Sequence, residues 1–414
     1  MSCWQYQHDV LHIENTSLKE IAEKYGTPCY VYSRTTIENN WLAFDRALHA
    51  MPHQICYAVK ANSNIAILNI LAHLGSGFDI VSQGELQRVI AAKGDPQKII
   101  FSGVGKTAAE IKRAIALGVG CFNVESISEL ERLQEIAASQ KKPIAIALRI
   151  NPNIDPQTHA YISTGLQENK FGMNFDDVLP VCQTLKNSPY VRLTGIACHI
   201  GSQVTAMKPF LQSIDYLLNI YHTLKMQGIS IEHINVGGGL GICYQNEKPP
   251  AIADYVSALQ KKLQDYPLKI ILEPGRAIVG NAGVLLTKIE YIKTTPDKNF
   301  AIVDAGMNDL LRPALYEAWH AILPVVIRHD INKEPYDIAG PVCESADFLG
   351  KQRKLAIAAE DLLAVCSAGA YGFSMSSNYN SRPRPAEILV HGKQAQIIRQ
   401  RETLEELFAG ERIL

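Results

Sequence analysis

The sequence predicts an α/β protein in which a parallel (β/α)8 TIM barrel is followed by an all-β domain. Three observations lead to this fold class. Eight short apolar runs recur between residues 54 and 274, segments with helical spacing of apolar residues separate them, and only short strand-like runs follow Gly283. Nearly continuous apolar strands need cover on both faces, and eight strand–helix units close into a barrel ringed by helices.

Each of the eight barrel runs carries polar residues or glycine near its end, and the segments between the runs carry helix-start signals. Thr107 with Glu110, and Ser128 with Glu131, each fit the capping box that satisfies free amide hydrogens in a first helical turn. In chain order the runs are ICYAVKA, GFDIVS, KIIFSGV, GCFNVES, IAIALRI, LTGIACHIG, HINVGGG and LKIILEP.

The rest of the chain predicts a β-sandwich or small β-barrel. Its runs are VLLTKIEYI, FAIVDAG, YDIAGPV, LLAVCSA, AEILVHG and AQIIR. A chain of 414 residues is also long enough for two domains. We therefore expect residues 30–280 to form the barrel and residues 281–414 the β domain. Residues 1–29 precede the barrel, and we expect them to join the β domain because chain ends often lie together.

Composition and charge exclude several classes of protein. Hydrophobic residues make up 47% and charged residues 20% of the chain, as in ordinary globular proteins. The formal net charge of -1 gives no field that would draw it to nucleic acid or to an anionic membrane, so a small zwitterionic ligand suits it better. Neither an export signal nor a membrane-spanning run is recognisable, which predicts a cytoplasmic protein. The nine cysteines lack metal-type spacing, so we expect no metal and mostly packed, reduced thiols.

Reacting groups in such barrels stand at the carboxyl ends of the strands. The first run ends in Lys60, where desolvation would lower the pKa of the amine and make it a nucleophile able to form a Schiff base with an aldehyde cofactor. Taken alone, Lys60 could equally reach solvent at a strand end. The second run carries Asp79, and the sixth contains His199 with Ser202 close behind. A single histidine there is more often structural than catalytic.

The last two runs offer an anion site and a carboxylate. The triplet Gly237–Gly239 lets backbone amides approach a phosphate closely, and barrels often bind phosphate after strands seven and eight, where Gly275 and Arg276 also fall. Three glycines can equally form a tight turn. Glu273 ends an apolar run and therefore needs a partner. A pyridinium nitrogen would serve, and so would a neighbouring Lys or Arg.

Longer motifs carry a resemblance that covers nearly all of the chain. In order they are YAVKAN, FDIVSQGEL, HIGSQ, GGG and EPGR, then GMNDLLRPALY, CESADFLG and GAYGFSMSSNYNSRPRPAE. On these motifs the sequence resembles the fold-type III decarboxylases that use pyridoxal 5'-phosphate (PLP) on an alanine racemase-like barrel, most closely the diaminopimelate decarboxylase family. The resemblance implies PLP as cofactor and a lyase reaction that removes one carboxylate from meso-2,6-diaminopimelate to give L-lysine and CO2, the last step of lysine biosynthesis by that route.

The resemblance also implies a role for individual residues. Lys60 would carry the cofactor, His199 would stack on its ring, Glu273 would pair with the ring nitrogen, and Cys343 would donate the proton that completes the reaction. The further residues implied to hold the cofactor are Asp79, Ser202, Gly237, Gly238, Gly239, Pro274, Gly275, Arg276 and Tyr371. Those implied to bind the substrate are Arg276, Arg312, Tyr316, Glu344 and Tyr371.

Two arginines and one glutamate suit a substrate that is charged at both ends. Read alone, Arg312 and Glu344 would more often form a surface or interface ion pair, and Cys343 would more often be a buried thiol. The resemblance further implies a homodimer with shared active sites, in which the Cys343 segment reaches the cofactor of the other subunit.

Related activities remain as alternatives. A decarboxylase acting on ornithine, arginine or carboxynorspermidine, or an amino-acid racemase, would use similar cofactor chemistry. A site for ornithine should hold an acidic group where this chain has Arg312. A PLP carrier or an inactive regulator is a different class, against which the chain retains Lys60, Glu273, Arg312 and Cys343.

Overall fold

The computed structural model describes residues 3–156, 159, 164–165, 169–185 and 188–414. The chain divides into two compact units. The unit that we call the β unit consists of Met1–Asn39, Cys243–Glu247 and Ile278–Leu414, and the barrel unit consists of Asn40–Ile242 and Lys248–Ala277. The division into residues 1–29, 30–280 and 281–414 stays a prediction.

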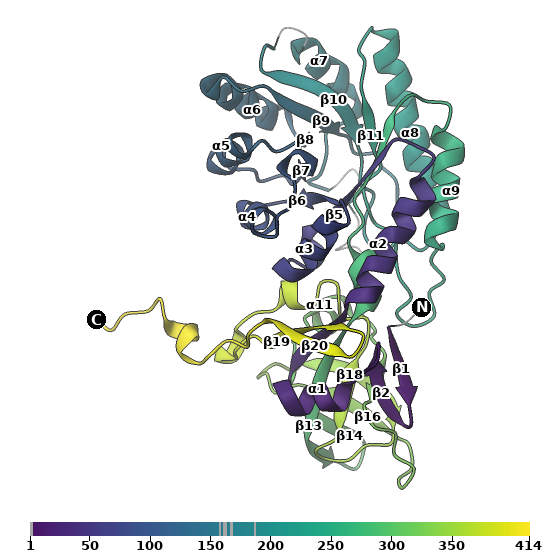
Figure 1. The fold of residues 1–414 in the computed structure, drawn as a ribbon, viewed down its shortest axis with the longest axis vertical. Helices are drawn as coiled ribbons and strands as arrows, with labels where there is room; N and C mark the ends of the chain where they lie inside the picture. Colours follow the sequence, from purple (N-terminus) through teal and green to yellow (C-terminus); the bar gives the residue numbers. More distant parts are fainter. Residues whose placement is uncertain (1–2, 157–158, 160–163, 166–168, 186–187) are drawn as a thin grey trace. The chain divides into compact units, whose positions relative to one another are not determined.

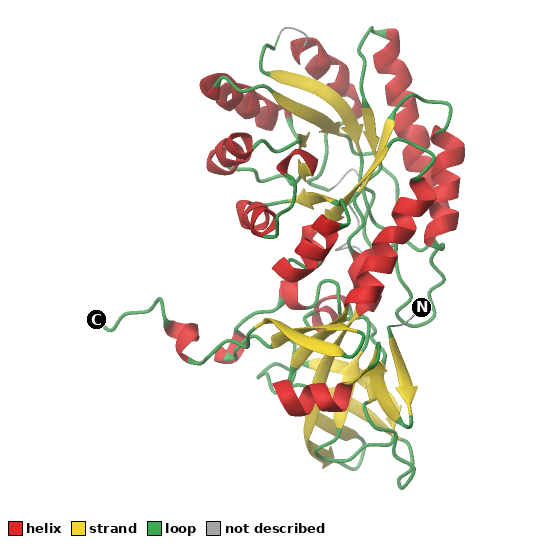
Figure 2. Cartoon of the chain, viewed as in Figure 1, coloured by secondary structure: helices red, strands yellow, loops and turns green. Residues whose placement is uncertain are grey.

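The barrel unit contains a closed barrel of eight parallel strands with helices around it, as the sequence predicts (Figures 1 and 2). Neighbouring strands follow the order of the sequence, and the last strand closes onto the first through pairs such as Leu272 with Ile55. The strands are β5 (His53–Ala58), β6 (Gly77–Ile80), β7 (Ile99–Phe101), β8 (Cys121–Val124), β9 (Ile144–Arg149), β10 (Val191–Ala197), β11 (His233–Asn235) and β12 (Lys269–Leu272).

Polar side chains start the helices that follow the first four barrel strands. The Oγ or Oδ atoms of Asn64, Ser82, Thr107 and Ser126 accept hydrogen bonds from amides of the first turn, and Thr107 forms the predicted capping box with Glu110. The helices from residue 34 to residue 279 are α2 (Arg34–Leu48), α3 (Ile65–His73), α4 (Gln83–Ala91), α5 (Ala108–Leu117), α6 (Ile127–Gln140), α7 (Phe175–Leu185), α8 (Met207–Met226), α9 (Ile252–Leu263) and α10 (Arg276–Val279).

The capping box predicted for Ser128 with Glu131 is wrong. Helix α6 already begins at Ile127, and Ser126 is its N-cap, with Oγ accepting a hydrogen bond from the Glu129 amide at 3.2 Å. Both Ser-x-x-Glu patterns fit the motif, but Ser126 comes first after strand β8 and has the extended backbone that an N-cap requires.

The barrel strands are buried on both faces, which explains their continuous apolar sequences. Every residue of β6, β7 and β8 is buried. Cys56, Ile100, Cys121, Ala147 and Ile271 form one apolar cluster, and because they come from five different strands they fill the barrel interior. Burial of a large aliphatic side chain such as that of an isoleucine contributes about 1.5–3 kcal/mol, so this packing fixes the strand ends that carry the polar residues.

The β unit is built on one large sheet with the order β17-β16-β14-β13-β4-β19-β20, and β18 joins β13 to β15. Strand β4 comes from the first part of the chain, yet it lies between β13 and β19. The strands are β1 (Trp4–Gln7), β2 (Val10–Ile13), β3 (Thr16–Ser17), β4 (Cys29–Ser33), β13 (Gly283–Thr294), β14 (Asn299–Val303), β15 (Ile322–Pro324), β16 (Glu334–Ala339), β17 (Phe348–Leu355), β18 (Leu362–Val365), β19 (Ala386–His391) and β20 (Gln394–Arg399).

Two short helices, α1 (Leu18–Tyr25) and α11 (Arg312–Tyr316), lie wholly within this unit. Residues from both ends of the chain share its core: Leu11, Ile21 and Val31 pack in one cluster with Val284 and Ile388. The first strands therefore depend on the last ones for burial.

The nine cysteines are all free thiols. Cys343 and Cys243 are exposed, Cys3 is half-buried and the other six are buried, so most of the thiols are packed as expected. Cys243 lies in the 243–247 segment outside the strands and helices. Among the described residues, no three or more His, Cys, Asp or Glu side chains gather as metal ligands would. Within the same residues, no helix has both the length and the apolar character needed to cross a membrane.

Candidate active site

Lys60 lies just after β5, in the 3-10 turn η1 (Val59–Ala61). Its Nζ forms an ion pair with Asp79 Oδ2 on the neighbouring strand β6, where Asp79 is in register with Ala58. The side chain of Asp79 is 1% exposed and that of Lys60 is 38% exposed. The side chain of Lys60 is therefore partly open to solvent, as the alternative expected, but a buried carboxylate holds its amine at the barrel end.

Glu273 stands after β12 and accepts hydrogen bonds from two asparagine amides. Its Oε1 lies 2.6 Å from Asn235 Nδ2 and 3.3 Å from Asn123 Nδ2. Burial and the negative charge of Asp79 raise the pKa of Glu273 to about 7, while the positive charge of Lys60 opposes this shift. Within the described part of the chain no salt bridge involves Glu273, so the alternative of a Lys or Arg partner is not what the structure contains.

The glycine triplet after β11 is packed too closely for any other residue. A Cβ at Gly238 would overlap the Glu273 carbonyl oxygen, and one at Gly237 would lie 2.6 Å from the Cys198 carbonyl oxygen. Gly239 has a φ of +102°, in the region that favours glycine. The triplet is therefore more than a tight turn, because it brings bare backbone against the end of strand β12.

His199 follows β10, and its ring is held in one neutral form. The Gly238 amide donates a hydrogen bond to His199 Nδ1 at 3.2 Å, so Nδ1 carries no proton and Nε2 carries it. Burial, together with the positive charges of Arg149 and Lys60, holds the pKa of His199 well below its usual range. A neutral aromatic ring is therefore presented beside the glycine triplet.

The Glu273–Arg276 turn links the glycine triplet to the lysine. The Ala58 amide donates to the Pro274 carbonyl at 3.2 Å, and a Cβ at Gly275 would lie 3.0 Å from the Ala61 Cβ. Arg276 opens α10, and its Nη2 donates to Ser202 Oγ at 3.1 Å. All predicted residues from Lys60 to Arg276 thus gather at the carboxyl end of the barrel, where its parallel strands end.

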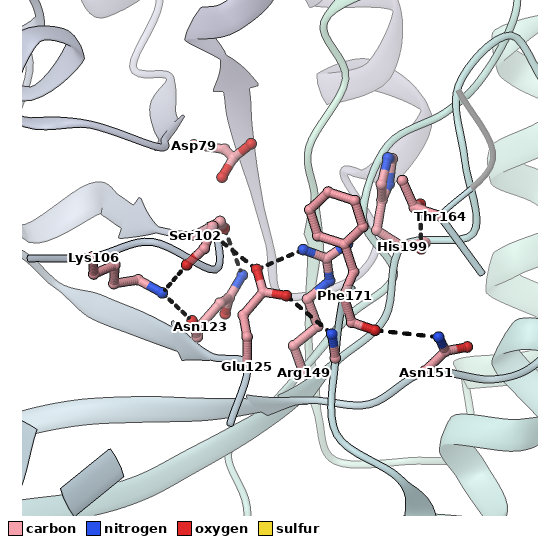
Figure 3. Close-up of polar contacts among 12 residues, drawn as sticks. Asp79, Ser102, Lys106, Asn123, Glu125, Arg149, Asn151, Thr164, Phe171 and His199 are labelled. Carbon is pink, nitrogen blue, oxygen red and sulfur yellow. Dashed lines mark hydrogen bonds and ion pairs between the residues drawn. The ribbon is translucent and has the colours of Figure 1, made fainter. Parts of the chain in front are cut away.

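A buried network that the sequence did not assign lies beside this group (Figure 3). Glu125 Oε1 accepts hydrogen bonds from Arg149 Nη1 at 2.7 Å and from the Gly103 amide at 2.9 Å, and its Oε2 accepts from the Gly172 amide at 3.1 Å. Arg149 also lies over the ring of Phe171, 4.9 Å from its centroid. The available signal was position, since Glu125 and Arg149 both stand at strand ends.

The remaining predicted residues belong to the β unit. Arg312 opens α11, Tyr316 closes it, and Tyr371 has a left-handed backbone with a φ of +55°. Arg312 is only 5% exposed and its Nη1 donates to His320 Nε2 at 2.8 Å. The alternative of a surface ion pair between Arg312 and Glu344 is therefore wrong, because Arg312 is buried, and that of an interface ion pair stays a prediction.

Cys343 and Glu344 lie in the loop between β16 and β17, and the segment 378–380 holds both. The Cys343 amide donates to Asn380 Oδ1 at 2.8 Å, and the Tyr379 hydroxyl donates to Glu344 Oε1. The Cys343 side chain is exposed, so the alternative of a buried packing thiol is wrong. The sequence did not single out Tyr379 or Asn380.

The barrel group fits PLP by its chemistry. Lys60 supplies the amine for an aldehyde, Glu273 supplies a carboxylate for a ring nitrogen, and Gly237–Gly239 supply a cradle that side chains would fill. Asp79 Oδ1 is buried and has no hydrogen-bond partner among the described residues, which marks this site as one that a polar group completes.

Comparisons with known proteins agree with this fit. The family model described as pyridoxal-dependent decarboxylase, pyridoxal binding domain, matches residues 34–280. Diaminopimelate decarboxylases of Haemophilus influenzae and Vibrio cholerae are 54% and 55% identical to the chain, and the matches cover 99% and 100% of both partners. The chain belongs to the diaminopimelate decarboxylase family.

The solved structure of diaminopimelate decarboxylase from M. jannaschii in complex with L-lysine matches this chain with a TM-score of 0.95. The two are 39% identical, and the match covers 99% of this chain and 98% of that one. Membership in this family makes the chain a PLP-dependent decarboxylase with the predicted fold.

Proposed function

We propose that this chain decarboxylates meso-2,6-diaminopimelate to L-lysine and CO2, the last step of lysine biosynthesis through that compound, and that Lys60 carries the PLP. The observation that carries the proposal is the meeting of an amine, a buried carboxylate and a bare-backbone cradle at one barrel end. The names of the relatives supply the substrate, because a diaminopimelate decarboxylase is 54% identical to this chain over 99% of its length.

The residues that would hold PLP come from the barrel unit, with Tyr371 added from the β unit. Ser202, Gly237–Gly239 and the Glu273–Arg276 turn offer the donors for its phosphate and ring. When bound, PLP accepts the electron pair that the departing carboxylate leaves on the substrate α-carbon. Glu273, which accepts a hydrogen bond from Asn235, would keep the ring nitrogen protonated, and the neutral ring of His199 would pack against the cofactor.

The substrate carries charges at both ends, and the chain offers a matching set. The arginines 276 and 312 bind carboxylates through paired N–H donors, with Tyr316 and Tyr371 beside them. Glu344 accepts the ammonium group that is remote from the reacting carbon. Cys343 then passes its thiol proton to the carbon that has lost CO2, which its exposed side chain allows.

The active form is a homodimer with shared sites, located in the cytoplasm. The exposed Cys343 and the exposed Tyr379 beside Glu344 support the shared sites, because the catalytic loop of the β unit is open to a second copy of the chain. Sedimentation at assay concentration checks this point, and a fully active monomer would contradict it.

One assay separates the proposal from its rivals. Release of CO2 is measured with meso-diaminopimelate beside ornithine, arginine and carboxynorspermidine, and racemisation is followed in the same samples. We expect diaminopimelate alone to be turned over rapidly. The variant Lys60→Ala should lose the visible absorption of the lysine-bound cofactor and at least about a thousandfold in turnover. A variant that kept both colour and turnover would refute the assignment of Lys60.

A further inference from the structure

The β unit holds Arg312 through an imidazole that is itself fixed. Arg312 Nη1 lies 2.8 Å from His320 Nε2, and the side chain of His320 is 0% exposed. A guanidinium has only donors, so His320 Nε2 must accept this hydrogen bond. His320 Nδ1 then carries the proton and donates it to the Cys366 carbonyl at 2.8 Å. The tautomer and the plane of the imidazole are therefore both determined.

The sheet of the β unit fixes this imidazole. Cys366 directly follows β18, and its amide donates to the Ala321 carbonyl at 2.8 Å. Ala321 is the residue after His320, so the acceptor of the imidazole proton and the backbone of the histidine are joined to each other. His320 therefore has little freedom to follow a movement of Arg312.

Tyr244 also contacts the guanidinium, through the face of its ring. The Arg312 guanidinium carbon lies 4.4 Å from the centroid of the Tyr244 ring, and that ring meets the His320 ring edge to face at 5.2 Å. Glu247 Oε2 accepts hydrogen bonds from the amides of Tyr244 and Gln245 at 2.9 and 2.7 Å, which closes the turn that presents the tyrosine.

We propose that His320 and Tyr244 are positioning residues that aim Arg312 at a carboxylate of the substrate. The inference rests on the proposed role of Arg312 in substrate binding. A free arginine side chain has many rotamers, and a carboxylate would have to order it on binding. The contacts with His320 and Tyr244 order it beforehand. A carboxylate at position 320 would neutralise the positive charge of Arg312. A neutral imidazole orients the guanidinium and leaves its charge unpaired by position 320. The positive charge thus stays available to the substrate.

The experiment compares kcat and KM for meso-diaminopimelate, and the inhibition constant of L-lysine, which keeps one carboxylate of the substrate. For His320→Phe we expect KM and the inhibition constant to rise about tenfold or more, with kcat within about twofold of the unmodified enzyme. His320→Gln, whose carbonyl oxygen can still accept from Arg312, should restore most of the lost affinity. Unchanged visible absorption of bound PLP reports an intact barrel site.

Matched variants keep the test decisive if His320→Phe fails to fold. Tyr244→Phe retains the ring and should leave KM near its original value, whereas Tyr244→Ala should raise it. His329→Gln changes an exposed histidine of the same unit and should alter neither constant. If Tyr244→Ala binds diaminopimelate and L-lysine normally, and His320→Phe does so too where it folds, the two residues only support the fold and the inference is wrong.

A further variant separates this inference from the proposed function. If Arg312→Ala leaves KM unchanged, the proposed role of Arg312 fails and the role of His320 fails with it. If Arg312→Ala raises KM and His320→Phe does not, only the positioning role is overturned. If both raise KM, the double variant should be no worse than Arg312→Ala, because both changes then remove one interaction.

Discussion

The barrel end and the loop of the β unit that carries Cys343 hold their polar groups in opposite ways. At the barrel end, Asp79 and Glu273 are placed by parallel strands and are withdrawn from water. In the β unit, Cys343 and Glu344 stand on an exposed loop whose contacts are supplied by another loop. Burial of the carboxyl groups at the barrel end costs free energy of folding. The side chains of Cys343 and Glu344 are exposed, so replacing them should alter the stability of the fold little.

The cost at the barrel end comes from carboxyl groups that are buried together. Burial raises the pKa of Glu85 to about 7, as it does for Glu273. A bound cofactor with a protonated ring nitrogen would offset part of this cost for Glu273. We therefore expect substitutions at the barrel end to change stability, and substitutions in the Cys343 loop to change catalysis alone.

The largest expected effect in the exposed loop is that of Cys343→Ala. Loss of a general acid lowers turnover by about 10²–10⁴-fold, because no other group would deliver the proton in the same place. The side chain is exposed, so the midpoint of thermal unfolding should stay unchanged. Steady-state CO2 release and calorimetry on the same preparation measure both quantities.

The matched control is Cys243→Ala, which changes the other exposed cysteine of the β unit and should leave turnover intact.

Mixing the Cys343→Ala variant with the Lys60→Ala variant tests whether the active sites are shared between subunits. If each site needs Lys60 from one subunit and Cys343 from the other, mixed dimers contain one intact site, and roughly a quarter of the original activity should return. Recovery of no activity in dimers shown to exchange subunits would argue against shared sites.

The second prediction concerns the stability of the protein without PLP and the variant Glu273→Gln. The pKa of Glu273 is about 7 in the folded protein against an ordinary value of 4.5. The folded state therefore holds a proton that the unfolded state releases, and the stability of the unmodified protein falls as pH rises from about 4.5 to about 7. The variant lacks this loss. It should equal the unmodified protein at low pH and exceed it at pH 8 by on the order of 3 kcal/mol.

Denaturant unfolding of both proteins across this pH range measures the difference directly. Glu85 and Asp309, whose pKa values burial also raises to about 7, remain in both proteins, so their contributions cancel. With PLP bound the advantage of the variant should shrink or reverse, since the carboxylate then has a positive partner. If the free energies of unfolding of the two proteins without PLP changed with pH in the same way, the pKa of Glu273 would not be raised and this prediction would be wrong.

Much of the barrel end could be predicted because a parallel barrel brings all its strand ends to one side. Lys60, Glu273 and the Gly237–Gly239 triplet were found in this way, and the fold class, the family and the cofactor are confirmed. Asn123 and Asn235 were not found, although both bind Glu273. Asn123 is separated from Glu273 by 150 residues, and only closure of the barrel brings the two together.

The β unit could be predicted far less from its residues. Cys343 and Glu344 lie in a loop without periodicity, so only their resemblance to a family motif indicated them, and their roles stay predictions. Nothing in the local sequence shows that Tyr379 bonds to Glu344 across 35 positions, since loop-to-loop contacts follow from the packing of the whole sheet. The same holds for Tyr244, which lies far from Arg312 in sequence and contacts it in the β unit.

The smallest expected effect concerns this contact between Tyr379 and Glu344. The hydrogen bond to Glu344 raises the pKa of Tyr379, so the hydroxyl remains a donor throughout the neutral range. Tyr379→Phe removes the donor but keeps the ring, and Glu344 loses a charge-assisted hydrogen bond that restricts its rotamer. We expect KM for diaminopimelate to rise about three- to tenfold with kcat unchanged, because Cys343, the proposed proton donor, is held separately by Asn380. Tyr291→Phe, on an exposed tyrosine of β13, is the control. A fall in kcat with KM unaltered would mean that Tyr379 acts on the proton donor instead, and that the two groups of the loop are not positioned independently.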